Sequence, residues 1–185
     1  MGKYTVKQLR NVALIAHGGA GKTTLAEALL FCTGSTKRLG SVDDGSSILD
    51  YDPEEIKRKI SINTAVAPCE WNSHKINILD TPGYFDFVGE VAGTLRVADG
   101  VVITVCAASG VEVGTEKAWT YCEEHELPRM FFINKMDREN ANFYKVLDTL
   151  QAKYGTNVIP LQLPIGQAEH FRGFIDLVRL KAYTF

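Results

Sequence analysis

Residues 11–32 read NVALIAHGGAGKTTLAEALLFC, and this stretch decides the fold. Asn11–His17 is almost continuously apolar, which is typical of a strand buried on both faces. A glycine-rich loop follows, and apolar residues then recur at helical spacing over Lys22–Cys32, until Gly34 provides a stop. The order strand, glycine-rich loop, helix is a local structure with which proteins bind phosphate groups.

The glycine-rich loop has the spacing of a P-loop, with Ala16 in place of the usual first glycine. Glycines let successive backbone N–H groups point at one anion, and the helix that begins at Lys22 directs its positive end there. Lys22 is expected to contact the β- and γ-phosphates, and the Thr23 hydroxyl to bind Mg²⁺. The alternative is a turn that merely joins strand to helix. The predicted phosphate-binding residues are Ala16, His17, Gly18, Gly19, Ala20, Gly21, Lys22, Thr23 and Thr24.

A second motif, Asp80-Thr81-Pro82-Gly83, comes directly after the predicted strand residues Lys75–Leu79. A carboxylate at such a strand end can hold Mg²⁺ through water. The backbone N–H of Gly83 can bind a γ-phosphate and move away when that phosphate is lost. Taken alone the motif is only moderately specific, because Asp and Gly near Pro are common turn residues. We predict nucleotide contacts for Asp80, Thr81, Pro82, Gly83 and Tyr84.

A third motif, Asn134-Lys135-Met136-Asp137, follows another predicted strand, Arg129–Asn134. The Asp137 carboxylate can accept both N–H groups on the Watson–Crick edge of guanine, where adenine presents an acceptor and is rejected. Asn134 can donate to the base, and the Lys135 stem can lie across its face. The tetrapeptide alone is weak, and a simple capping turn is an equal alternative. Three motifs in this order, each at a strand end where open α/β sheets bind ligands, predict a GTP-binding domain.

Strands and helices alternate along the rest of the chain, which predicts an α/β fold with a mostly parallel sheet flanked by helices. Thr36–Ile62 has no clear period and is expected to be a long, mobile, functional loop. The other predicted elements are a hairpin over Ala65–Trp71 and Lys75–Asp80, helices over Phe87–Val97, Thr115–Glu124 and Asn140–Lys153, a strand over Gly100–Ala107, and strand-like tails over Val158–Leu163 and Gly173–Tyr183.

The composition is that of a globular chain, with 45% hydrophobic and 23% charged residues among 185. The formal charge of −2 gives no excess positive field, so free DNA and membranes are not expected partners. Four cysteines (Cys32, Cys69, Cys106 and Cys122) form no metal-binding pattern and are expected to be small buried side chains. We expect a cytoplasmic monomer.

The chain resembles the GTP-binding domain of translation elongation factor G almost throughout. The resemblance is carried by RNVALIAHGGAGKTTLAEALLF, INILDTPGYFDFVGEV, LRVADGVVITVCAASGVEVGTEKAW, PRMFFINKMDR and VIPLQLPIG. It implies a P-loop NTPase G domain, GTP or GDP with Mg²⁺ as ligands, and ribosome-dependent GTP hydrolysis in the translocation step. It also implies that the ribosome is a partner of the full-length protein.

The resemblance aligns residues 57–62 with the family's first switch, so that Ser61 takes the place of the Mg²⁺-binding Thr. The positive run at residues 57–59 faces either solvent or the ribosome. Three positions depart from the family pattern: Gly19 replaces an Asp, Lys59 a Gly, and Tyr84 the His that orients the attacking water. These departures suggest a divergent paralogue similar to elongation factor G 2. The resemblance assigns catalytic positions to Lys22, Gly83 and Tyr84, and Mg²⁺ ligands to Thr23, Ser61 and Asp80.

The resemblance also divides the chain into a GTP-binding core over residues 1–156 and the beginning of an insertion subdomain over 157–185. No Ser follows Asp137, so the Ser-Ala motif that closes over guanine is missing, and we expect a truncated chain. The alternatives to an elongation factor are a ribosomal-protection GTPase and a GTP-dependent ribosome binder with weak hydrolysis. A P-loop kinase or ATPase would leave residues 134–137 unexplained.

Overall fold

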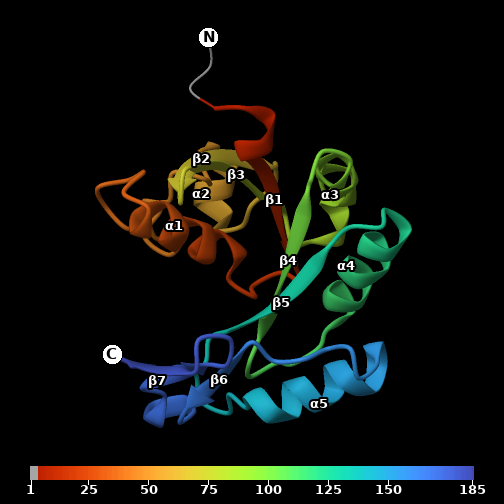
Figure 1. Cartoon of the computed structure of the whole chain (residues 1–185). Helices are drawn as coiled ribbons and strands as arrows, with labels where there is room; N and C mark the ends of the chain where they lie inside the picture. The colour runs from red at the N-terminus through yellow and green to blue at the C-terminus, as the bar shows by residue number, and fades with distance from the viewer. Residues whose placement is uncertain (1–3) are drawn as a thin grey trace. The chain divides into compact units, whose positions relative to one another are not determined.

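The computed structural model describes residues 4–185 and contains two sheets (Figure 1). The larger sheet has the strand order β2-β3-β1-β4-β5, in which β1 is parallel to both β3 and β4, and β2 is antiparallel to β3. Its strands are β1 Leu9–Ala16, β2 Ala65–Trp71, β3 His74–Asp80, β4 Gly100–Cys106 and β5 Arg129–Asn134. The smaller sheet is antiparallel, with β6 Gln162–Ile165, β7 Gly173–Asp176 and β8 Lys181–Thr184.

The longer helices follow the predicted alternation with the strands. They are α1 Lys22–Cys32, α3 Val88–Leu95, α4 Val113–Glu124 and α5 Phe143–Tyr154, with a short α2 over Pro53–Arg58. Single 3₁₀ turns occur at Val6–Gln8, Phe85–Phe87 and Ala168–His170. Helix α1 contacts β1, β2 and β3, whereas α3 and α4 contact β1 from its other side (Figure 1). The predicted mostly parallel α/β fold is therefore confirmed.

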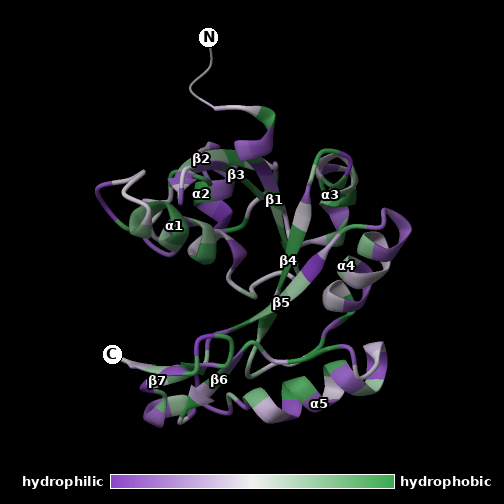
Figure 2. Cartoon of the chain, viewed as in Figure 1, coloured by the Kyte–Doolittle hydropathy of each residue, from purple (hydrophilic) through white to green (hydrophobic). Residues whose placement is uncertain are grey.

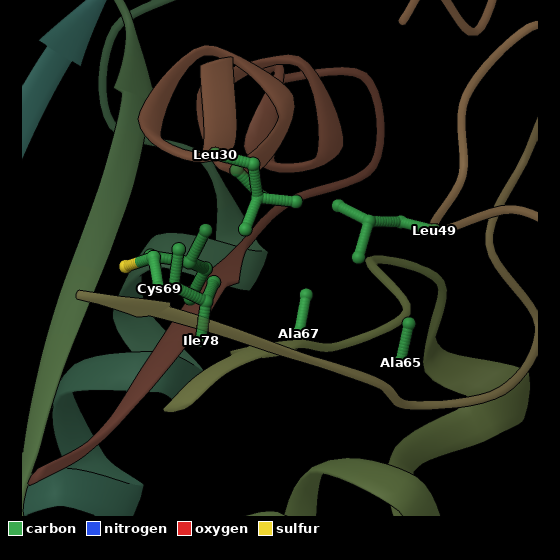
Figure 3. Close-up of a cluster of buried hydrophobic side chains, with 8 residues drawn as sticks. Leu30, Leu49, Ala65, Ala67, Cys69 and Ile78 are labelled. Atoms are coloured by element: carbon green, nitrogen blue, oxygen red, sulfur yellow. The ribbon is translucent and has the colours of Figure 1, made fainter. Parts of the chain in front are cut away.

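The main core lies between α1 and the sheet. Leu14 on β1, Leu30 on α1 and Ile78 on β3 are almost completely buried there. Figure 3 shows Leu30 pointing from the helix toward Ile78 and Cys69, while Leu49 comes in from the loop that precedes α2. In Figure 2, β4 is largely hydrophobic along its length, as expected for a strand covered on both faces. This packing fixes the ends of β1 and β3, where the first two motifs begin.

The segment 36–62 is not the uniform loop that was predicted, because it contains α2. Asp52 caps this helix by accepting from the Glu54 N–H, Glu55 completes a capping box, and Pro53 occupies the first turn. A helix of six residues is too short to show a hydrophobic period, so only its capping residues could have revealed it.

Three further expectations need correction. The tail Gly173–Tyr183 is two strands rather than one, because the Asp176 side chain accepts from the N–H groups of Val178 and Arg179 and makes a turn between β7 and β8. Likewise β6 begins at Gln162, later than the predicted strand at 158–163. Among the cysteines, Cys69, Cys106 and Cys122 are buried as expected, but Cys32 at the end of α1 is exposed.

The chain forms two compact units. The first runs to Thr104 and includes Val113–Phe132, and the second consists of Val105–Glu112 and Ile133–Phe185. The predicted division at residue 156 falls inside the second unit and stays a prediction, and residues 1–3 of its core lie outside the described residues. In the described part of the chain, no helix has the length and apolar character needed to cross a membrane.

Candidate nucleotide-binding site

The predicted phosphate loop joins the end of β1 to the start of α1. Gly19 and Gly21 have φ angles of 78° and 94°, a left-handed conformation that favours glycine. Gly21 is also the N-cap residue of α1, and the Ala20 N–H donates to the His17 carbonyl across 3.3 Å. The first turn of the helix therefore opens directly from the loop, as the sequence predicted.

Lys22 is buried in the first turn of α1, with only 6% of its surface exposed. Burial lowers the pKa of its ammonium group, while the negative charges of Asp80 and Asp50 oppose this shift. A buried ammonium group in a low-dielectric environment interacts strongly with any phosphate placed beside it.

Asp80 ends β3 and is 1% exposed, with no hydrogen-bond partner for either carboxylate oxygen. Burial raises its pKa to about 7, against the opposing effects of the Lys22 charge and of the neighbouring Thr23 hydroxyl. A buried carboxylate without partners is costly unless a cation or donor completes it. This environment is the one expected of a carboxylate that binds a ligand.

Three oxygen-bearing side chains form a hydrogen-bonded chain at the start of α1. The Ser61 hydroxyl donates to Asp50 Oδ1 across 2.7 Å, and Ser61 Oγ lies 3.0 Å from Thr23 Oγ1. Because Ser61 has a single hydroxyl proton, Thr23 is the donor in the second bond. The structure thus brings together Thr23 and Ser61, the two hydroxyls predicted to bind Mg²⁺.

The donor set in this region fits Mg²⁺, which prefers oxygen ligands. The unpartnered oxygens are both of Asp80 and Oδ2 of Asp50, and the hydroxyls are those of Thr23 and Ser61. Over residues 4–185 no group of three or more His, Cys, Asp or Glu side chains could hold a metal without further ligands. A P-loop site does not need such a group, because phosphate oxygens and water supply the remaining ligands.

Asp50 was not among the predicted site residues. It is 4% exposed, and burial raises its pKa while the hydrogen bond from Ser61 opposes the shift. It lies in a stretch rich in Asp, Ser and Gly, where its neighbours Asp43, Asp44 and Asp52 have the same side chain. Only the three-dimensional packing singles it out.

Two buried glutamates hold the segment that carries Asp50 and Ser61. Glu27 of α1, which is 0% exposed, accepts through Oε1 from the Ser47 hydroxyl and the Ile48 N–H, both across 2.7 Å. Glu55 of α2 accepts through Oε1 from the N–H groups of residues 62 and 63, each across 2.9 Å. The loop donates its hydrogen bonds to these two carboxylates instead of to neighbouring strands or helices. No local sequence pattern predicted this role for either glutamate.

The second predicted motif lies against the phosphate loop. Thr81 is buried and donates through its hydroxyl to the Leu14 carbonyl across 2.7 Å, so this side chain is engaged in the fold. Pro82 is buried as well. A methyl carbon added to Gly83 would lie 2.6 Å from Lys22 Nζ and 2.9 Å from Gly18 Cα. Gly83 therefore meets the lysine ammonium group and the loop backbone directly.

The third motif belongs to the second compact unit and is held by main-chain hydrogen bonds. The Ala107 N–H donates to the Asn134 carbonyl across 2.8 Å, and Lys135 follows with a left-handed φ of 59°. The Met136 side chain is buried and packs with neighbouring apolar side chains of the core. Asp137 is exposed, as a residue that reads a base must be before the base arrives.

Comparisons with known proteins agree with this geometry. The family model of the elongation factor Tu GTP binding domain matches residues 7–183. Elongation factor G of Salinibacter ruber is 42% identical over 182 residues, which cover 98% of this chain and 26% of that protein. Elongation factor G 1 of Syntrophomonas wolfei is 42% identical over 180 residues, covering 97% of this chain and 27% of that protein.

A solved structure gives the same result. A crystal structure of a protein from Thermus thermophilus superposes with a TM-score of 0.91 and 42% identity, covering 96% of this chain and 27% of that one. The chain thus spans about a quarter of the length of the relatives it matches. The resemblance to the GTP-binding domain of elongation factor G is confirmed, and the finer assignment to a divergent paralogue stays a prediction.

Proposed function

Because this chain belongs to the family of elongation factor Tu GTP-binding domains, we propose that it binds GTP and GDP with Mg²⁺ and hydrolyses GTP as part of a translation factor. The observation that carries the proposal is the buried pair of opposite charges at the phosphate loop. Lys22 and Asp80 are both buried, and neither oxygen of Asp80 has a hydrogen-bond partner. A bound phosphate would neutralise the charge of Lys22, and a bound Mg²⁺ would neutralise that of Asp80.

In this proposal the phosphates are held by the loop from Ala16 to Thr24. Its backbone N–H groups and the positive end of α1 face the anion, and the Lys22 ammonium group contacts the β- and γ-phosphates. Gly83, which lies beside Lys22 Nζ, would offer its N–H to the γ-phosphate after its segment has moved to admit that phosphate.

Thr23 and Ser61 would hold Mg²⁺ directly and Asp80 would hold it through water, with Asp50 as an additional oxygen group next to Ser61. When bound, Mg²⁺ neutralises charge that develops on the phosphates during hydrolysis. Binding would require Ser61 to exchange its bond to Asp50 for the metal. The buried glutamates Glu27 and Glu55 would keep the segment in place during that exchange.

The guanine base is assigned to Asn134, Lys135 and Asp137, with Asp137 accepting from both N–H groups of the Watson–Crick edge. This assignment is supported by the family resemblance and by the exposure of Asp137.

We also propose the ribosome as a partner of the protein to which this domain belongs, with a monomeric, cytoplasmic factor as the functional form. The relatives, which carry the name elongation factor G, favour elongation over ribosomal protection. A GTP-dependent ribosome binder with weak hydrolysis is the second candidate. Tyr84 favours it, since a phenol is neutral at pH 7 and brings no positive charge to the water or the phosphates.

The test is calorimetric titration of the purified chain with GDP and ADP, each with Mg²⁺ and with EDTA. We expect GDP to bind and ADP to bind far more weakly, with a loss of GDP affinity in EDTA. Equal affinities for GDP and ADP would overturn the assignment of Asp137 as the base-reading residue. The same affinity in Mg²⁺ and EDTA would overturn the metal site.

A further inference from the structure

Three consecutive residues after the second motif's proline lie on the phosphate loop. Gly83 meets Lys22 Nζ and the Gly18 backbone, as described above. The Tyr84 ring follows, with its Cζ 3.0 Å from the place that a Cβ on Gly18 would occupy. The Phe85 ring has an edge contact with the His17 ring at 6.1 Å between centroids, and Lys117 Nζ lies 3.9 Å from its centre.

Gly18 is a glycine for a different reason from its neighbours. Gly19 and Gly21 have positive φ angles, whereas Gly18 does not, so its backbone conformation would accept any residue. A Cβ at position 18, however, would lie 3.0 to 3.2 Å from three ring atoms of Tyr84, closer than ordinary carbon contacts. The missing side chain at position 18 is therefore what allows the Tyr84 ring to rest on the loop.

We propose that Gly18 and Tyr84 form a matched pair that makes the site discriminate between GTP and GDP. With the ring on Gly18, residues 83 and 84 cover the loop beside the Lys22 ammonium group, where a third phosphate would lie. GTP is then admitted only when the ring leaves Gly18, whereas GDP needs no such movement. This inference rests on the proposed nucleotide site and deepens it by naming the residues that set its preference.

The segment with Tyr84 and Phe85 is held on the phosphate loop weakly enough to leave it reversibly. Tyr84 and Phe85 are 46% and 42% exposed, so the segment is docked by one face only and can be released. If GTP binds only to the released form, its apparent affinity falls in proportion to the fraction of molecules that are released. Burial of part of an apolar ring against the loop is enough to change that fraction by about five-fold.

The proposal gives the ring and the hydroxyl of Tyr84 different roles, and these roles can be tested separately. A role in holding the attacking water would need the hydroxyl, whereas a cover needs only the ring. Tyr84→Phe keeps the ring on Gly18, and Tyr84→Ala removes it. Gly18→Ala leaves Tyr84 intact but pushes the ring outward by a few tenths of an ångström, which weakens its contact with the loop.

The experiment measures the dissociation constants of GDP and of a non-hydrolysable GTP analogue for the full chain, with Mg²⁺ present, by calorimetry. The readout is the ratio of the two constants. We expect Tyr84→Ala to shift it about five-fold in favour of the GTP analogue, and Gly18→Ala to shift it in the same direction by less, with no further shift in the double variant beyond that of Tyr84→Ala. Tyr84→Phe is expected to keep the wild-type ratio. Gly93→Ala in α3, where an added methyl meets nothing within 4 Å, is the matched control and should change neither constant.

An unchanged ratio in Tyr84→Ala would overturn the inference, and so would a Tyr84→Phe variant that behaves like Tyr84→Ala. Additive shifts in the double variant would show that the two residues act separately, which also contradicts a matched pair. If Gly18→Ala does not fold by circular dichroism, the two Tyr84 variants still decide the question. A wild-type chain that binds neither nucleotide would instead disprove the proposed function.

Discussion

The candidate phosphate site and the candidate base-reading loop are built in opposite ways. The phosphate site in the first unit buries its charges: Lys22, Asp50 and Asp80 are each at most 6% exposed, and carboxylate oxygens lack partners. The base-reading loop in the second unit leaves Asp137 exposed and is shaped by main-chain hydrogen bonds. Buried unpaired charge costs free energy of folding, whereas an exposed carboxylate costs almost none. The phosphate site should therefore gain stability from its ligand, and the base-reading loop should already be formed without one.

The largest expected effect that tests this contrast comes from Lys22→Ala. Removing the buried ammonium group that faces the β-phosphate should lower GDP affinity about 100-fold. The unliganded chain should still fold but lose stability, because Asp80 and Asp50 are left without the opposing charge. Calorimetry and thermal unfolding measure the two quantities. Lys57→Ala, an exposed lysine in α2, is the control and should change neither. Unchanged GDP affinity in Lys22→Ala would show that the glycine-rich loop is only a turn.

Asp137→Asn should act on the base and on nothing else. We expect GDP affinity to fall about 10-fold, because one charged acceptor of the guanine edge is lost, while stability changes by less than about 0.5 kcal/mol. Asp148→Asn, in α5, serves as the control for removing a carboxylate from the same unit. A clear loss of stability in Asp137→Asn would contradict a base-reading loop whose shape does not depend on the Asp137 side chain.

Glu55→Gln tests how the segment with Ser61 is held. Glu55 now accepts hydrogen bonds from three backbone N–H groups, and the amide of a glutamine would turn its own NH₂ toward at least one of them. Because that bond would be lost, we expect the free energy of unfolding to fall by about 1–2 kcal/mol. The adjacent Glu54→Gln removes only exposed ion pairs and should cost less than about 0.5 kcal/mol. Equal losses in chemical denaturation would mean that Glu55 does not organise the segment.

The smallest effect concerns the pH dependence of the unliganded chain. Because the pKa of Asp80 is raised to about 7, the folded chain binds a proton there more tightly than the unfolded chain does. The stability from this group is thus fully present below its ordinary pKa of 3.8 and is lost as the pH rises through about 7.

In EDTA, Asp80→Asn should therefore be more stable than the wild type at pH 8, on the order of 1 kcal/mol, and the difference should shrink toward about pH 5. Thermal unfolding at both pH values measures this, with the exposed Asp86→Asn as the control. A wild type that gains stability relative to Asp80→Asn as the pH rises between those two values would contradict the burial of an unpaired carboxylate.

Much of the fold and the site followed from local sequence. The helix over Lys22–Cys32 and the strand over Arg129–Asn134 have the predicted bounds. The glycines before the helix and the short apolar run of the strand set the local backbone conformation, which depends on adjacent residues. In the hairpin, β2 also has the predicted bounds, and β3 begins one residue earlier than predicted, at His74. The three motifs identified the family for a similar reason, since each has a fixed spacing at a strand end.

Only the tertiary structure decided which of the many charged residues are buried and what they contact. Asp50 and Glu27 look like any other acidic residues in the sequence, and their partners lie 11 or more positions away. Gly18 looks like a P-loop glycine, yet its φ is ordinary and its role is to leave room for Tyr84, 66 residues later in the chain. Local patterns specify backbone conformation because it depends on adjacent residues, whereas burial, charge pairing and close contacts depend on segments that meet only after folding.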